Sequence, residues 1–526
     1  MSVQNINITP NNHFQSIQQS LELNARKLTS KIAISQIDKY ISYSELEQKS
    51  NQLANLLILQ GARAKQPIAI CGENSIAIII GILAILKIGA PYVPISHQYP
   101  ISRIQYIIED TDAHLILSDN KNFKLFENCS QEIINIEHDE KFIHLSSQKP
   151  LYEVNETDLA YIIYTSGTTG NPKGTLIEHK SLLHLFNSTK KLFNFSVEDN
   201  WLLFHSFVFD FSIWEIWGAL YNGGTLFIAD KRSIINPKQL HKLLLTNKIT
   251  ILNQTPSAFH RLAMNTDISE LEKNSSLKTI IFGGEKVTKK ILKPWFSQIT
   301  SNSAIDLVNM YGLTEGTIHV TYHQITEEDF NTNNTSNIGK PFGNIKCHIL
   351  DDDKNPINTP GTGELYIEGP CLAQGYLNQP ELTANVFIKN NTSFVINNRI
   401  YKTGDLVKVT ENGDMIYMGR RDEQVKINGY RIELTEIENI LIDHPCIDNC
   451  CVVVVENSYL DKWLCAFFQS GKTVSEEDLL TYLHNYLPNY MIPVEYKQIA
   501  NTPLNINGKL DKKSLLEKYY SELKTA

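Results

Sequence analysis

The stretch that decides the fold runs from Leu159 to Gly174 and reads Leu-Ala-Tyr-Ile-Ile-Tyr-Thr-Ser-Gly-Thr-Thr-Gly-Asn-Pro-Lys-Gly. Its first part is a short apolar, β-branched run, which predicts a buried strand. The second part interleaves glycines with hydroxyl residues before Lys173, so backbone N–H groups, hydroxyls and a cation can converge on an anion. Pro172 stands where a Walker A loop has glycine, which excludes that motif. The pattern favours a phosphate-binding loop over the alternative, a turn-rich linker.

Short apolar strands alternate with helical patterns before this loop. Residues 66–71 and 113–117 read as strands, and residues 75–87 and 103–110 between them read as helices. Such alternation predicts parallel strands joined by crossover helices, which is an α/β architecture.

The character of the sequence changes after about Asn344, where short strands separated by Gly and Pro predict a β-rich subdomain. After Asp422 the chain continues for about a hundred residues, which is enough for a small α+β domain. We therefore expect a large N-terminal core over residues 1–421 and a small C-terminal domain over residues 422–526.

Composition excludes several classes of protein. The 526 residues carry 48 Lys and Arg against 57 Asp and Glu, a net charge of −9, so we expect no nucleic-acid partner. The longest uncharged, mostly apolar run, residues 75–86, is too short to span a bilayer, and no secretory signal opens the sequence. The eight cysteines lack metal-binding spacing and read as reduced thiols. We expect a cytoplasmic protein without a membrane partner.

Further motifs follow in order along nearly the whole chain. They are residues 41–46 (ISYSEL), 86–94 (LKIGAPYVP), 209–215 (FDFSIWE), 309–315 (NMYGLTE), 401–406 (YKTGDL), 419–438, 487–493 (LPNYMIP) and 507–512 (NGKLDK). Together with the loop at residues 165–174, they resemble the adenylate-forming superfamily of acyl-CoA synthetases, luciferases and nonribosomal peptide synthetase adenylation domains. The chain departs from the family pattern at Cys371, Gln374, Asn428 and Thr435, where no chemistry is expected.

The resemblance implies both a fold and a reaction. The fold is a large N-terminal domain of two αβ-layered subdomains plus a β-rich subdomain, followed by a small, mobile α+β C-terminal domain. The reaction is that of an AMP-forming ligase, in which a carboxylate attacks the α-phosphorus of ATP and pyrophosphate leaves in line. ATP and Mg²⁺ are therefore expected, because the phosphate charge must be neutralised and two anions must be held together.

The resemblance also assigns the residues that act on ATP. Thr314 is expected at the α-phosphate, and Glu315 at Mg²⁺, which prefers hard carboxylate oxygens. Lys509 is expected to bridge the substrate carboxylate and a ribose-phosphate oxygen, offsetting the repulsion between two anions. Tyr311 would stack on adenine, and Asp405 would accept hydrogen bonds from the ribose hydroxyls. The expected ATP- and AMP-binding residues are Thr165, Ser166, Gly167, Thr168, Thr169, Lys173, Gly284, Glu285, Asn309, Tyr311, Gly312, Asp405, Tyr417 and Arg420.

Asp422 resembles the hinge about which the small domain turns after adenylation. The rotation would remove Lys509 from the site and bring the face at residues 428–432 toward a thiol acceptor.

Asp210 indicates which class of acid is activated. In amino-acid-activating members, an Asp in this context pairs with the substrate α-ammonium, and a buried carboxylate without a cation is costly. The alternative is an N-cap of the helix predicted at residues 211–220, and both roles are compatible. Fatty-acid and aryl-acid relatives lack this Asp.

The substrate pocket, aligned by eye, reads D-F-W-N-I-G-M-I-H-K and resembles the threonine type, with Ile318 in place of Val. We expect Asn253 and His319 to hydrogen-bond a β-hydroxyl, so valine would leave buried polar groups unpaired and serine is the expected competitor. His179, His184 and His205 show no partner pattern and read as structural. The pocket positions are Asp210, Phe211, Trp214, Asn253, Ile281, Gly283, Met310, Ile318, His319 and Lys509.

These expectations combine into one function. We expect a stand-alone monomer that activates L-threonine and loads it on the phosphopantetheine thiol of a carrier protein acting in trans, since no carrier or condensation segment flanks the motifs. One alternative is an amide- or CoA-ligase with another acceptor for the same adenylate, acting on serine or a threonine analogue. A nucleotide-binding scaffold is a third class, which the presence of Lys509, Glu315 and Asp405 argues against.

Overall fold

The strand predicted before the glycine-rich loop is present as β7 (Leu159–Thr165), inside a seven-stranded sheet of order β18-β8-β7-β4-β3-β5-β6. The computed structural model describes residues 14–167, 170–299, 303–332, 336–357, 359–389, 399–457, 461–499 and 512–525. Strands β3 to β7 pair in parallel, and β8 pairs antiparallel with both β7 and β18. The bounds are β3 (Ile68–Cys71), β4 (Tyr92–Ile95), β5 (Leu115–Ser118), β6 (Glu132–Asn135), β8 (Lys173–Glu178) and β18 (Gly375–Tyr376).

A 14-stranded sheet has the order β16-β17-β20-β21-β15-β14-β13-β12-β11-β9-β10-β1-β2, with β19 paired to β20. The neighbours from β13 to β1 pair in parallel, whereas those from β16 to β13 pair antiparallel. The parallel half and its β2 edge comprise β1 (Ile32–Gln36), β2 (Lys39–Ser42), β9 (Asn200–Leu203), β10 (Thr225–Ile228), β11 (Ile251–Gln254), β12 (Thr279–Phe282) and β13 (Asp306–Asn309). The β-rich half comprises β14 (Thr321–Gln324), β15 (Asn337–Pro341), β16 (Lys346–Leu350), β17 (Gly361–Glu368), β19 (Phe387–Lys389), β20 (Arg399–Val409) and β21 (Met415–Arg420).

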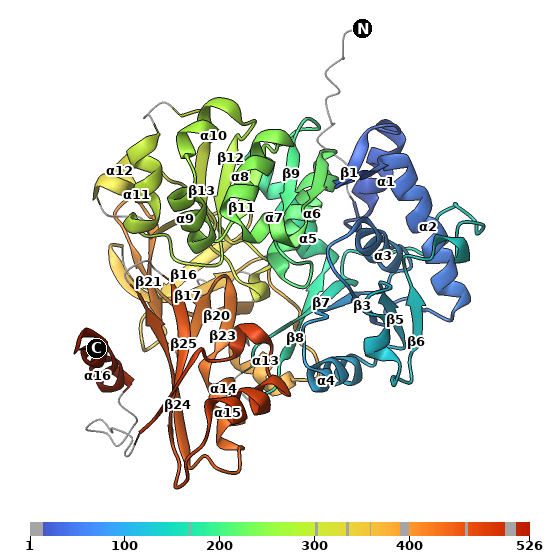
Figure 1. Cartoon of the computed structure of the whole chain (residues 1–526). Coiled ribbons are helices and arrows are strands. Elements are labelled where there is room, and N and C mark those ends of the chain that lie inside the picture. Colours follow the sequence, from blue (N-terminus) through green and yellow to red (C-terminus); the bar gives the residue numbers. More distant parts are fainter. Residues whose placement is uncertain are drawn as a thin grey trace.

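Helices cover both sheets and fill the space between them (Figure 1). Helices α2, α3, α5 and α6 belong to the apolar core that the two sheets share. Helices α8 to α11 cover the far face of the larger sheet, and α4 covers the far face of the smaller one. The bounds are α1 (Gln19–Lys27), α2 (Tyr43–Leu59), α3 (Ile76–Lys87), α4 (Ile101–Thr111), α5 (His179–Thr189), α6 (Asp210–Asn222), α7 (Lys231–Ile235), α8 (Pro237–Thr246), α9 (Pro256–Asn265), α10 (Ile268–Asn274), α11 (Lys289–Gln298), α12 (Glu327–Thr332) and α13 (Pro380–Val386).

The sequence of β3 explains this layering. Side chains alternate between the faces of a strand, so Ile68 and Ile70 enter the core between the sheets, while Ala69 and Cys71 face α4. Helix α3 is apolar all round and lies buried in the shared core, as a helix without a polar face must. The side chain of Ser75 accepts a hydrogen bond from the Ile78 N–H and thereby caps the start of α3.

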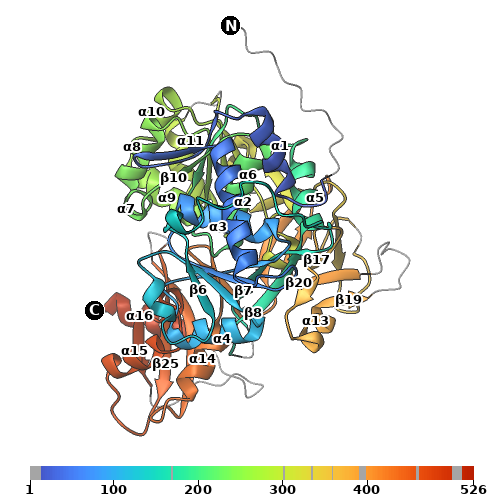
Figure 2. The same ribbon diagram turned by 90° about the vertical axis from the view of Figure 1, so that its right-hand side faces the viewer.

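The chain after Asp422 forms a small α+β unit, which we call the lid (residues 422–526). A hairpin of β22 (Gln424–Ile427) and β23 (Tyr430–Glu433) precedes a three-stranded sheet of order β24-β25-β26. One face of that sheet packs on α14 and α15, and the other packs on α16. In Figure 2 the lid lies below the core on the side of α4. The bounds are α14 (Leu434–Ile442), β24 (Asn449–Glu456), β25 (Lys462–Gln469), α15 (Glu476–His484), β26 (Glu495–Gln498) and α16 (Lys512–Thr525).

The predicted α/β class, with a β-rich region before a small α+β C-terminal part, is confirmed. The predicted hinge residue, Asp422, follows β21 and precedes β22. None of the described helices combines the length and apolar character that spanning a bilayer requires.

Candidate active site

A cavity of about 440 Å³ lies between the core and the lid, at the carboxyl ends of β7 and β13. Ligands of open α/β sheets bind at this edge of the strands. The predicted residues that line it are Thr165, Ser166, Asp210, Phe211, Gly284, Met310, Gly312, Thr314, Ile318, His319, Asp405 and Arg420. The lid contributes Lys426, Asn428, Gly429, Tyr430, Arg431 and Tyr490. Phosphate-loop, ribose and substrate positions therefore meet at one place, although they are far apart in the sequence.

A second cavity, of about 670 Å³, adjoins the first and shares Gly284, Met310, Gly312, Arg420 and Lys426 with it. Its wall contains the predicted hinge residue Asp422 and several positions predicted to bind ATP or AMP. The latter are Gly284, Glu285, Asn309, Tyr311, Gly312, Tyr417 and Arg420. The rings of Tyr311 and Tyr417 lie 6.3 Å apart, centroid to centroid.

Gly312 lines both cavities and packs closely against the chain that follows η3 (Thr314–Gly316). A Cβ atom at this position would lie 1.9 Å from the carbonyl oxygen of Ile318, so only glycine allows this close approach.

The lid lies directly on the phosphate loop. The Ser166 hydroxyl donates to the carbonyl oxygen of Arg431 at 2.8 Å, and the Gly167 N–H donates to Oε2 of Glu436 at 3.0 Å. Glu436 also forms a buried ion pair with Arg103 of α4, with Nη1 and Oε1 2.8 Å apart. In this orientation of the lid, loop groups suited to phosphate oxygens bind protein atoms. Thr168 and Thr169 of the loop, and Lys509, lie outside the described residues.

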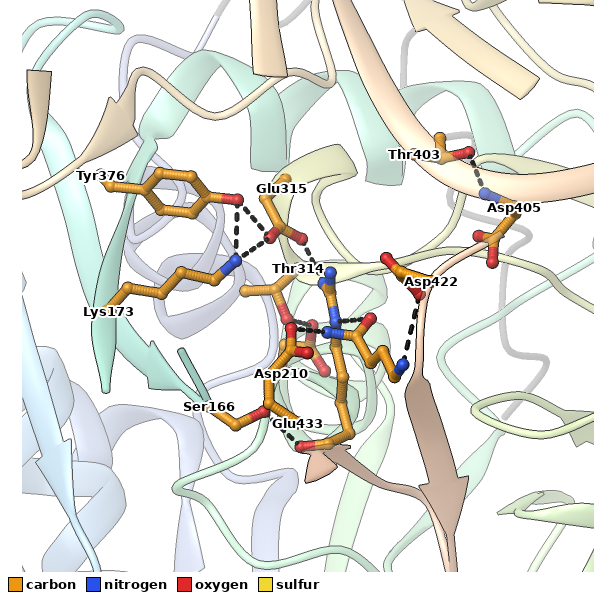
Figure 3. A network of polar contacts seen from close by, with 12 residues as sticks. Ser166, Lys173, Asp210, Thr314, Glu315, Tyr376, Thr403, Asp405, Asp422 and Glu433 are labelled. Atoms are coloured by element: carbon orange, nitrogen blue, oxygen red, sulfur yellow. Dashed lines mark hydrogen bonds and ion pairs between the residues drawn. The ribbon is translucent and has the colours of Figure 1, made fainter. Parts of the chain in front are cut away.

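Glu315 is enclosed by positive charge (Figure 3). Its Oε1 accepts a hydrogen bond from the Tyr376 hydroxyl at 2.6 Å and lies 3.6 Å from Nζ of Lys173. Its Oε2 accepts a hydrogen bond from Nη1 of Arg431 at 2.6 Å. Burial opposes ionisation of Glu315, but Arg431 and Lys173 hold its pKa well below the usual range. Glu315 is therefore an ionised carboxylate, and one of its cationic partners comes from the lid.

Asp210 has a different environment at the other end of the cavity. Helix α6 begins at this residue, and Phe209 occupies the N-cap position, so the Asp210 carboxylate is not the cap. Its Oδ2 accepts a hydrogen bond from the Thr314 hydroxyl at 2.6 Å. Burial raises the pKa of Asp210, while Thr314 and the charge of Lys426 partly offset this effect. Among the described residues Asp210 has no salt-bridge partner, so a cationic ligand would stabilise its charged form.

The predicted ribose-binding carboxylate, Asp405, is connected to the hinge. It accepts hydrogen bonds from the Tyr311 hydroxyl and from Nη1 of Arg420, the latter at 2.8 Å. The same guanidinium binds both carboxylate oxygens of Asp422, at 2.6 and 2.7 Å. Arg420 therefore joins the nucleotide end of the site to the first residue of the lid.

The substrate pocket is only partly the one expected. Phe211, Met310, Ile318 and His319 line the 440 Å³ cavity, whereas Trp214, Asn253, Ile281 and Gly283 do not. Asn253 does not line this cavity: its Oδ1 accepts a hydrogen bond from the indole N–H of Trp214 at 3.0 Å, and its Nδ2 is buried without a partner among the described residues. The Trp214 ring contacts His319 edge to face, and the contact of Asn253 with a substrate hydroxyl stays a prediction.

His205 and Lys426 line the cavity although neither is assigned to the site from the sequence. His205, read there as structural, lines the cavity and stacks on Phe211 with ring centroids 4.3 Å apart. Lys426 lines both cavities and interacts with Asp405 and Asp210. The signal for His205 was its position five residues before Asp210. By contrast, His179 is buried outside both cavities and contacts the backbone N–H of Ile17 through Nδ1 at 3.4 Å.

Comparison with known proteins gives consistent family matches. Residues 21–377 match the AMP-binding enzyme family, and residues 436–509 match the AMP-binding enzyme C-terminal domain. The dimodular nonribosomal peptide synthase of Bacillus subtilis (strain 168) is 36% identical over 92% of this chain and 21% of that protein. Syringomycin synthase SyrB1 of Pseudomonas syringae pv. syringae is 34% identical over 93% of this chain and 80% of that protein.

A solved structure is similar over most of its length. It is an NRPS protein containing adenylation and PCP domains, bound to a vinylsulfonamide inhibitor; its TM-score is 0.83 and its identity 26%, over 96% of this chain and 84% of that one. The chain spans less than a quarter of the length of several long curated relatives, with 7%, 18% and 21% of the protein covered in three cases.

Proposed function

This chain belongs to the AMP-binding enzyme family, and we propose that it activates L-threonine as the aminoacyl-adenylate and then transfers it to the phosphopantetheine thiol of a carrier protein in trans. The observation that carries this proposal is the single cavity that contains Asp210, Thr314 and the start of the phosphate loop. A buried carboxylate without a cation suits a ligand that carries an ammonium group. The neighbouring phosphate loop suits a triphosphate.

The first step needs the substrate carboxylate beside the α-phosphorus of ATP. Asp210 binds the α-ammonium group, Thr314 contacts the α-phosphate, and Lys509 bridges the two anions. Asp405 and Tyr311 bind ribose and adenine. Glu315 has the oxygen ligands that Mg²⁺ prefers, and this ion neutralises charge on the phosphates when it is bound. In the present lid orientation Nη1 of Arg431 donates to Oε2 of Glu315, so Glu315 would be available to hold the ion only after Arg431 has withdrawn.

The second step uses the lid orientation seen here. Residues 428–431 line the cavity, and Glu436 and Arg431 bind loop groups that the phosphates need in the first step. We infer that this is the transfer orientation and that rotation about Asp422 exchanges it for one that presents Lys509. The similar solved structure contains adenylation and PCP domains, which supports a carrier protein as the partner.

Threonine is proposed from the character of the cavity wall. Phe211, Met310 and Ile318 provide apolar contacts for a methyl group, and His319 provides ring nitrogens that have no hydrogen-bond partner among the described residues. A site built to hydrogen-bond a hydroxyl rejects an analogue that lacks it far more strongly than an apolar pocket rejects one missing methyl group.

ATP–pyrophosphate exchange with each of the twenty amino acids tests the first step. We expect threonine to give the highest kcat/KM, serine to follow, and valine to give little exchange. Exchange that is supported by a fatty or aryl acid, and by no amino acid, would contradict the substrate class. The Lys509→Ala variant should fold normally and lose exchange, and normal exchange by this variant would remove the assigned role of Lys509.

The second step is tested by incubating the chain with ATP, threonine and purified carrier proteins that bear phosphopantetheine. We expect a threonyl thioester, detected by intact-protein mass spectrometry. An amide product without thioester would instead indicate an amide ligase.

A further inference from the structure

His205 is positioned by a buried carboxylate. Nδ1 of His205 lies 2.9 Å from Oε1 of Glu215, a fully buried residue of α6. Oε2 of Glu215 accepts hydrogen bonds from the backbone N–H groups of Phe204 and His205, at 3.1 and 3.0 Å. Burial raises the pKa of the Glu215 carboxyl, while His205 and the two backbone N–H groups favour its charged form. When Glu215 is ionised, Nδ1 of His205 carries the hydrogen atom.

The opposite nitrogen of the ring has no such partner. Nε2 of His205 is buried and makes no hydrogen bond within the described residues, and the ring lines the 440 Å³ cavity. Buried polar atoms in proteins nearly always have a partner, so this atom marks a place for a ligand group or a water molecule. In a neutral ring with its hydrogen on Nδ1, Nε2 is an acceptor.

His319 faces the same part of the cavity. Its ring meets the edge of Phe211, on whose face His205 stacks. Both ring nitrogens of His319 are buried without a partner among the described residues. Burial, together with the nearby His205, lowers the pKa of His319 to about 3. A neutral His319 has one donor nitrogen and one acceptor nitrogen, so the two rings together offer both halves of a hydroxyl's hydrogen bonds.

We propose that His205, oriented by Glu215, is a specificity-determining residue whose Nε2 accepts a hydrogen bond from the side-chain hydroxyl of the substrate, with His319 donating to the hydroxyl oxygen. The inference rests on the proposed function, because it assumes that the cavity holds an amino acid. It assigns the hydroxyl-reading role to the His205–His319 pair, both of which line the cavity, whereas Asn253 does not. Glu215 is a positioning residue, since it acts only through His205.

The chain contains a matched pair that shows what a merely structural histidine looks like. Nε2 of His348 lies 2.8 Å from Oε2 of Glu368, and the exposed fractions of the two side chains are 14% and 0%, against 15% and 0% for His205 and Glu215. His348 lies on β16 and lines neither cavity of the site. Both pairs thus join a histidine nitrogen to a fully buried carboxylate with similar exposure, but only His205 lines the cavity.

The experiment compares His205→Phe with His348→Phe. The readout is the ratio of kcat/KM values for threonine and for 2-aminobutyrate, which is threonine without its hydroxyl group, in ATP–pyrophosphate exchange. We expect His205→Phe to lower this ratio at least tenfold and to retain exchange with 2-aminobutyrate, which also demonstrates that the variant folds. His348→Phe should leave the ratio unchanged.

Two further variants separate the roles in the pair. His205→Gln keeps a polar atom near the place of Nε2 and should restore part of the ratio. Glu215→Gln keeps the shape of the carboxylate but weakens its hold on the Nδ1 hydrogen, so it should lower the ratio less than His205→Phe does.

Several results would overturn the inference. One is a His205→Phe variant that keeps the ratio of the unmodified chain, and another is a variant that loses exchange with both amino acids equally, which is the effect of a structural role. Equal exchange of threonine and 2-aminobutyrate by the unmodified chain would overturn this inference and leave amino-acid adenylation standing. Exchange with no amino acid at all would overturn the proposed function itself.

Discussion

The site has a phosphate end, which contains Ser166, Gly167 and Glu315, and an acid end, which contains Asp210, His205 and His319. The two ends differ in how many of their buried polar groups have partners within the protein. At the phosphate end Ser166, Gly167 and Glu315 all bind partners, and residues of the lid supply at least one partner for each. At the acid end His319 and Nε2 of His205 are buried without partners among the described residues. Among the described residues, these three phosphate-end groups have protein partners, whereas the Thr165 hydroxyl and those histidine nitrogens of the acid end have none.

This difference indicates which ligand groups each lid orientation admits. Because buried polar atoms are nearly always hydrogen-bonded, the docked lid satisfies Ser166, Gly167 and Glu315, whereas the unpartnered nitrogens of His205 and His319 leave room for a ligand or water. The structure therefore suits the stage at which the phosphates have left and the acyl group remains. Four predictions test this contrast, from the largest expected effect to the smallest.

Glu315→Gln should have the largest effect at the phosphate end. The variant loses the negative charge that would hold Mg²⁺, so ATP–pyrophosphate exchange should fall about a thousandfold. It should also lower the free energy of unfolding, because Arg431 and Lys173 lose their buried partner. Glu368→Gln changes an equally buried carboxylate outside both cavities and should leave exchange unchanged. Exchange in Glu315→Gln within a few-fold of the unmodified chain would contradict the assignment.

Asp210→Asn should have the opposite effect on stability. Exchange should fall about a hundredfold, because a charged hydrogen bond to the ammonium group is lost. The free energy of unfolding should rise by about 1 kcal/mol, since burial disfavours the charge of Asp210 and no salt bridge compensates it in the described residues. Chemical denaturation without substrate measures this. A variant that is inactive and also less stable than the unmodified chain would contradict the proposal that Asp210 binds a cationic ligand group.

Glu436→Gln should separate the two half-reactions. The substitution breaks the buried ion pair with Arg103 and weakens the contact with the Gly167 N–H, so the docked lid becomes less stable. Transfer to the carrier should fall about tenfold in single-turnover assays, while exchange stays within twofold. Lys497→Gln, on the exposed edge of the lid, serves as the control. Equal losses in both half-reactions would argue against a role confined to transfer.

The smallest effect concerns pH at the acid end. The pKa of His319 is lowered from 6.5 to about 3, so the ring stays neutral down to well below pH 6. We expect the KM for threonine to change less than twofold between pH 6 and pH 8, after correction for ionisation of the substrate. Because folding lowers this pKa, the associated stabilisation is fully present above pH 6.5 and is lost as the pH falls toward 3. A KM that rises steeply below pH 6.5 would show that His319 is protonated in the working enzyme.

Much of this organisation is predictable from the sequence, for a physical reason. The strand and glycine-rich loop at residues 159–174, and the polar residues after β13, are local patterns, and parallel strands bring their carboxyl ends to one edge. Side-chain orientation is not local. Asn253 accepts a hydrogen bond from an indole N–H of another element and does not line the cavity, and His205 gains its proposed role from Glu215 and a cavity formed by distant segments.

No single sequence motif predicts the orientation of the lid either. It depends on the balance between contacts that only one orientation allows, such as Arg103 with Glu436 and Tyr430 stacked on Tyr490 against Phe209. Sequence patterns predict that the lid rotates about Asp422. The relative free energies of the competing core–lid interfaces decide which lid orientation is populated.

The wall of the smaller cavity has one more consequence. Lys426, Gly429, Tyr430 and Tyr490 belong to the lid, so the compartment around the acyl group is assembled from two bodies. In the proposed reaction, a mixed anhydride formed there would be shielded from solvent by that two-part wall. Its residence time would then depend on how often the lid separates from the core.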